Sequence, residues 1–126
     1  MEKKYTSGLK TTFLVHVIVG AIFGLIYLLI PEIFGNLINW PVKDIYFTRL
    51  VGAAILAFTV SSWFAYKAPT WNQVRITVQM EIVWTVLATL LMLWGLLAGM
   101  LPSIAWTNAI LMAGFAVAFS YFYFRK

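Results

Sequence analysis

The chain has 126 residues and a net charge of +5, with 63% hydrophobic and 10% charged residues. Soluble domains average about 45–50% apolar and about 25% charged residues, so this composition excludes an ordinary water-facing surface. The absence of cysteine excludes disulfides, thiolate metal sites and thiol catalysis.

The first predicted element is a membrane-spanning helix over residues 12–30. It ends before Pro31, because proline cannot continue the hydrogen-bond ladder of a helix. The run has the length of a span and no A-x-A-like cleavage site follows it, so we expect a retained helix rather than a signal peptide. Residues 31–44 carry apolar side chains at helix-like spacing, which predicts a short interfacial helix with Trp40 at headgroup level.

Three further spans are predicted, over residues 45–66, 74–99 and 104–124. Thr70 and Gln73 have the spacing of a capping box before the third span. The sequence therefore predicts an all-α polytopic membrane protein, a single four-transmembrane-helix bundle over residues 1–126 with a short interfacial segment between its first two helices. A β-structure is excluded, because lipid-facing strands would alternate with polar residues.

Basic residues predict the orientation, because Lys and Arg concentrate in the cytoplasmic flanks of membrane proteins. Seven of the nine basic residues belong to the two termini and the second loop: Lys3, Lys4, Lys10, Lys67, Arg75, Arg125 and Lys126. Lys43 and Arg49 fall on the opposite side. We therefore expect a multi-pass protein with both termini in the cytoplasm and with membrane lipids as partners. Nucleic acid is not an expected partner, because the positive charges are divided among three short flanks.

Four polar residues inside the spans form the candidate intramembrane site: His16, Glu81, Arg49 and Asn108. Such residues are costly within a bilayer and mark a functional site by default. At about 1.5 Å per residue, His16 and Glu81 are expected at a similar depth in the inner half, and Arg49 and Asn108 in the outer half. Structural alternatives stay open: His16 and Glu81 could simply pair, Arg49 could snorkel outward, and Asn108 could bond across helices.

Small residues predict the faces on which the helices pack. The G-x-x-x-G spacing, which lets helix backbones approach closely, occurs at Gly20 and Gly24 and again at Gly95 and Gly99. His16 shares a helical stripe with Gly20, and the stripe of Glu81 continues through the second pair of glycines. These faces are expected to point into the bundle.

A family resemblance rests on Pro31 and on the run RLVGAAIL that begins at Arg49. The chain resembles small four-helix integral membrane proteins of bacteria and archaea that carry a P-x(n)-R-L-x-G-A-x-x-L motif. This resemblance implies a four-helix bundle in a bacterial or archaeal cell membrane and no established activity. In layout the chain is distantly similar to DoxX-like proteins, which would imply an accessory subunit for quinone-linked electron transfer. Small multidrug resistance transporters share its length, but their essential first-helix glutamate has no counterpart, because this chain has His16 and then Gly20.

The favoured hypothesis is a protein that binds a hydrophobic ligand or lipid, or an accessory membrane subunit. The alternative is a small proton-coupled transporter in which Glu81 and His16 share a proton, and the second alternative is an intramembrane enzyme. No catalytic motif, cofactor or metal site is predicted, because the chain lacks H-E-x-x-H and G-x-S-x-G and one His with one Glu makes a poor metal site. A hydrophobic small molecule, a second copy of the chain and a partner membrane protein stay open as partners.

Overall fold

The structure is a computed structural model that describes residues 3–125, and within them it contains helices and no strands. Four helices are long and apolar enough to cross a membrane: α1 (Ser7–Leu29), α3 (Ile45–Lys67), α4 (Trp71–Leu97) and α5 (Ala105–Phe124). The expected short helix after Pro31 is α2 (Pro31–Leu37). The predicted all-α, four-span architecture is therefore confirmed. Lys126, which belongs to the basic C-terminal flank, lies outside the described residues.

Local capping explains where three of the helices begin. The helix α1 starts five residues before the predicted span, because the Thr6 hydroxyl accepts a hydrogen bond from the backbone N–H of Leu9 at 3.3 Å. Asp44 caps α3 by accepting from the N–H of Phe47 at 2.9 Å. At α4 the Gln73 side-chain oxygen accepts from the N–H of Thr70 at 3.3 Å, which is the return bond of the predicted capping box.

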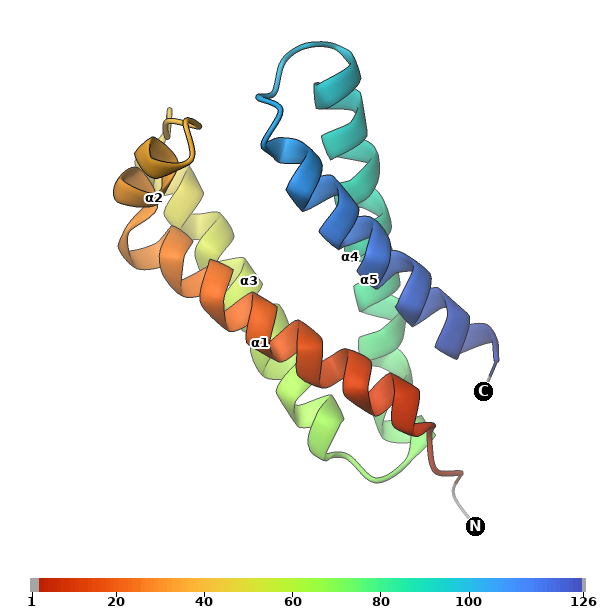
Figure 1. The fold of residues 1–126 in the computed structure, drawn as a ribbon. Coiled ribbons are helices and arrows are strands. Elements are labelled where there is room, and N and C mark those ends of the chain that lie inside the picture. The colour runs from red at the N-terminus through yellow and green to blue at the C-terminus, as the bar shows by residue number, and fades with distance from the viewer. Residues whose placement is uncertain (1–2, 126) are drawn as a thin grey trace.

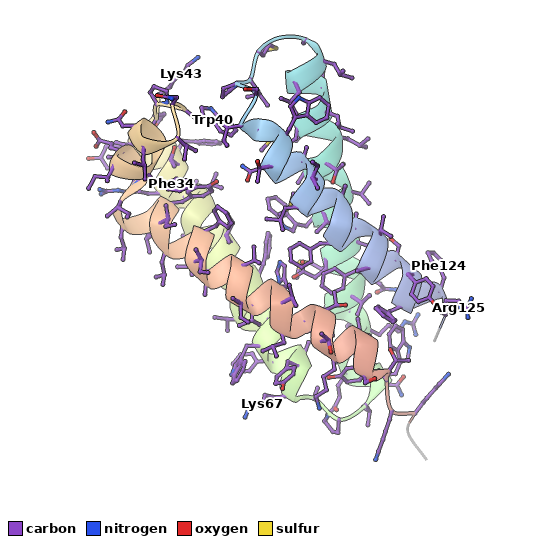
Figure 2. The ribbon with its side chains drawn as sticks, in the orientation of Figure 1. Phe34, Trp40, Lys43, Lys67, Phe124 and Arg125 are labelled. Carbon is purple, nitrogen blue, oxygen red and sulfur yellow. The ribbon has the colours of Figure 1, made fainter. Side chains whose placement is uncertain are left out.

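The four long helices form two hairpins, α1 with α3 and α4 with α5, which diverge from one end of the molecule (Figure 1). Both described chain ends and the loop between α3 and α4 lie at the end where the hairpins meet, and we call this the basic end. The opposite end, which we call the open end, carries α2 and the loop between α4 and α5. Figure 2 shows Lys67 and Arg125 at the basic end and Phe34, Trp40 and Lys43 at the open end.

Glycines bring α1 and α3 into close contact. Gly20 packs against Thr59, and a Cβ on Gly24 would approach the side chain of Leu56 to 2.8 Å. A Cβ on Gly52 would meet the backbone nitrogen of Leu28 at 2.7 Å. The first predicted glycine pair thus lies at a helix–helix contact, where the missing side chains allow the backbones to approach.

The second predicted glycine pair has a different role from the one expected. Gly95 packs against the side chain of Leu101 in the loop that follows α4, so its neighbour is a loop and not another helix. Gly99 lies beyond the end of α4 at Leu97 and has a φ of +72°, and a Cβ added to it would meet no atom within 4 Å. It serves the turn, because glycine adopts the left-handed conformation without steric cost.

The buried core lies at the basic end and joins the two hairpins. Its members come from all four long helices: Leu9, Phe13, Ala65, Trp71, Val74, Val78, Phe115 and Phe119. Elsewhere large apolar side chains such as Ile18, Val83 and Val117 are more than half exposed, as expected for helices that face lipid tails. The core therefore closes the molecule at one end only.

Candidate functional site

Three buried polar side chains meet where the hairpins join, and we call them the His–Ser–Glu cluster. Nδ1 of His16 on α1 lies 2.8 Å from Oγ of Ser62 on α3. The Ser62 hydroxyl donates to Oε1 of Glu81 on α4 at 3.1 Å, and His16 Nε2 lies 3.4 Å from Glu81 Oε2. Ser62 and Glu81 are fully buried and His16 is 4% exposed. The cluster is thus a buried polar group built from three helices, in which Glu81 Oε2 has no hydrogen-bond partner among the described residues and faces His16 Nε2 at ion-pair distance.

Helical periodicity places each member of the cluster. His16 follows Phe13 on the buried stripe of α1 that continues to Gly20. Glu81 lies on the buried stripe of α4 between Val78 and Thr85, whose hydroxyl donates to the Glu81 carbonyl oxygen at 2.7 Å. The two residues predicted to share a depth are therefore brought together.

Hydrogen-bond accounting limits the positions that the protons of the cluster can take. The single hydroxyl proton of Ser62 is donated to Glu81, so the short contact with His16 requires that Nδ1 of the imidazole carries a proton. The facing atoms, His16 Nε2 and Glu81 Oε2, then hold one proton between them if the pair is to be neutral in its buried site. The proton is either on the imidazole, as an ion pair, or on the carboxyl group.

A narrow apolar cavity of about 130 Å³ begins at His16, and we call it the inner cavity. It lies among the four long helices, and many of its large lining residues are aromatic or sulfur-containing: Phe23, Tyr27, Phe58, Trp84, Met92, Met112 and Phe115. Ser62 and Glu81 do not line it. His16 is therefore the member of the cluster that contacts the cavity.

A second cavity of about 720 Å³, the outer cavity, lies at the open end between α2 and the loop after α4. Both cavities are lined by Tyr27, Met92 and Asn108, which we call the neck. Tyr27 on α1 and Asn108 on α5 supply the polar side chains of the neck. The two cavities thus adjoin at the neck, and the inner cavity reaches His16 beside the buried core.

The remaining candidate, Arg49, is not part of this arrangement. It is exposed on the first turns of α3, and it lines neither cavity. Asp44, the acidic residue just before α3, caps the same helix. Among the candidates, the structure thus brings together His16 with Glu81 and separately places Asn108 at the neck.

Two site residues were not among the predicted ones, Ser62 and Tyr27. Ser62 resembles an ordinary packing residue, although its i, i+3 spacing from Thr59 puts two hydroxyls on the buried face of α3 and could have singled it out. Tyr27 resembles an interfacial aromatic residue, and Asn108, which lines the same cavities, is too distant in sequence for the sequence to relate the two.

Metal binding has little support from the side chains. His16 and Glu81 are the metal-ligating groups of the cluster, and residues 3–125 contain no group of three His, Cys, Asp or Glu side chains placed to hold an ion.

Comparisons with protein-family models, curated proteins and solved structures give no significant match to the chain. The resemblance to small four-helix membrane proteins therefore stays a prediction.

Proposed function

We propose that the protein binds a small hydrophobic molecule in the cavity between its two hairpins. The observation that carries this proposal is the inner cavity, which is apolar along its walls and adjoins the outer cavity at the neck. Ligand sites are concave and mostly apolar with a few placed polar groups, and Tyr27 and Asn108 are such groups here.

The cluster itself supports binding more than catalysis. Its connectivity, Ser62 to His16 to Glu81, has the order of a hydrolase triad. A nucleophile must reach its substrate, however, and Ser62 is fully buried and lines neither cavity. This burial agrees with a structural role, in which the cluster forms the polar end of a binding cavity.

Native mass spectrometry from mild detergent tests the binding proposal. The wild-type protein should carry a small molecule that Ala88→Phe removes, because Ala88 lines the inner cavity and a phenyl group would fill it. Ala57→Phe is the matched control, since Ala57 is exposed on α3 and lines neither cavity. A wild-type protein without any bound molecule, or an equal load on both variants, would contradict the proposal.

Proton-coupled transport is the second candidate function, and one observation favours it. His16 and Glu81 face each other at 3.4 Å, His16 lines the inner cavity, and the two residues belong to different hairpins, so a shared proton would lie between the hairpins. Movement of that proton would change the contact that holds the hairpins together. Proteoliposomes with an imposed pH gradient test this in uptake assays with a panel of small hydrophobic solutes. Uptake that Glu81→Gln abolishes supports transport, whereas equal uptake by the variant contradicts it.

We further propose that the basic end faces the cytoplasm of a bacterial or archaeal cell. Cations at this end lie over aromatic rings, with Lys67 Nζ 5.1 Å from the Trp63 ring centroid and Arg125 5.4 Å from that of Tyr121. Aromatic and basic side chains together are typical of the cytoplasmic interface. Membrane lipids would then surround the exposed apolar faces.

A further inference from the structure

The size of the inner cavity limits what it can hold. Its volume is about 130 Å³. An engineered apolar cavity of about 150 Å³ in another protein stays dry and binds benzene. The inner cavity therefore has room for one six-membered ring, whereas a long acyl chain or a fused-ring compound would exceed it.

The walls of the inner cavity favour an aromatic ring over an aliphatic group of the same volume. Phe23, Phe58, Trp84 and Phe115 supply aromatic edges and faces, and aromatic pairs gain from offset or edge-to-face contact beyond the area they bury. The thioethers of Met92 and Met112 also make favourable contacts with aromatic rings.

His16 contributes a ring surface to the cavity and no free hydrogen-bonding group. Nδ1 contacts Ser62 at 2.8 Å and Nε2 faces Glu81 Oε2 at 3.4 Å, so both ring nitrogens are directed towards the buried cluster. The imidazole already packs edge-to-face on Phe115, with ring centroids 5.1 Å apart. A ligand group that lies against His16 is therefore expected to be apolar.

Polar groups are available to a ligand at the neck, at the other end of the inner cavity. Asn108 offers both a donor and an acceptor, and the Tyr27 hydroxyl offers both as well. A substituent that hydrogen-bonds there would be directed towards the outer cavity, which has space for it. The position of these groups fixes the direction in which a ligand would lie.

From these features we infer that the inner cavity takes a monocyclic aromatic compound with one hydrogen-bonding substituent, its ring against His16 and its substituent at Tyr27 and Asn108. The inference rests on the proposed binding function and specifies the ligand class of the same site. It concerns the part of the ligand inside the inner cavity, and a longer tail would extend through the neck into the outer cavity.

Fluorine NMR of the full chain in lipid nanodiscs tests the inference, with 4-fluorophenol, fluorobenzene and 1-fluorohexane as probes and empty nanodiscs to measure partition into lipid. Both aromatic probes should bind saturably, and 1-fluorohexane should not. Asn108→Leu should weaken 4-fluorophenol binding about tenfold, the loss of one hydrogen bond, and change fluorobenzene binding less than about twofold. Tyr27→Phe is a smaller change to the fold and should also weaken the binding of 4-fluorophenol. Asn72→Leu, on an exposed position of α4, is the matched control.

The outcomes separate this inference from the binding proposal. Saturable binding of 1-fluorohexane alone overturns the aromatic assignment, and so does equal weakening of the binding of both aromatic probes by Asn108→Leu. The binding proposal would still be supported if native mass spectrometry finds a bound molecule that Ala88→Phe removes. Failure of all three probes to bind also overturns the assignment. A wild-type protein that carries no bound molecule in native mass spectrometry overturns the binding proposal itself.

Discussion

Nε2 of His16 lies 3.4 Å from Oε2 of Glu81, and this contact joins the two hairpins. His16 belongs to the α1–α3 hairpin and Glu81 to the α4–α5 hairpin, and both side chains are buried. Polar groups in such a position stabilise the fold only as long as each has its partner. The contact therefore links the two hairpins, and a change in its protonation would alter how they pack together.

Removal of both partners of the His16–Glu81 pair is expected to cost less than the sum of the two single removals. His16→Leu or Glu81→Leu leaves a buried polar group without its partner, which costs about 3–5 kcal/mol of unfolding free energy for a buried pair. The double variant removes both groups, so its loss should be smaller than the sum of the single losses. Thermal unfolding in detergent, monitored by size-exclusion chromatography, measures the loss of stability in the two single variants and the double variant. Additive losses would show that the pair is not coupled.

Ser62→Ala should destabilise the protein by about 1–3 kcal/mol, because Nδ1 of His16 and Oε1 of Glu81 both lose their hydrogen-bond partner. Ser61→Ala is the matched control on the adjacent residue. Ser61 is half-buried, and its hydroxyl makes one long contact of 3.4 Å with Thr77. Chemical denaturation should therefore rank Ser62→Ala well below Ser61→Ala in stability, and equal effects would contradict a bridging role for Ser62.

Two glycine substitutions should have opposite effects on stability. Gly52→Ala puts a Cβ 2.7 Å from the backbone nitrogen of Leu28, so α1 and α3 must move apart and lose packing. Gly114→Ala meets no atom within 4 Å and should gain up to about 1 kcal/mol from helix propensity. Apparent melting temperatures compare the two variants directly. A harmless Gly52→Ala would mean that this close approach does not hold the hairpin together.

Cysteine labelling in intact cells can establish the orientation, because the chain has no cysteine of its own. Lys67→Cys reports on the basic end and Lys43→Cys on the open end, and both residues are exposed. A membrane-impermeant maleimide should label Lys43→Cys in intact cells and Lys67→Cys only after the cells are opened. The reverse pattern would show that the basic end faces outward.

Much of the architecture could be predicted from composition and from single residues. Runs of apolar residues located the four spans, Pro31 marked the end of α1, and Thr70 with Gln73 marked the start of α4. The site was predictable only in part. Equal depth suggested that His16 and Glu81 could meet. Ser62 joins the cluster through a hydrogen bond to a helix distant in sequence, and Tyr27 lines cavities formed with other helices.

The four-span helical architecture follows from composition alone, because the energetic cost of a polar backbone in lipid leaves apolar helices as the available structure for such a chain. The pairing of the helices, the divergence of the hairpins and the apolar cavity that reaches His16 emerge only from the packing in three dimensions. This division arises because a membrane helix is apolar on every side. Hydrophobic periodicity then does not distinguish a face in contact with lipid from one that packs on a neighbouring helix or lines a cavity.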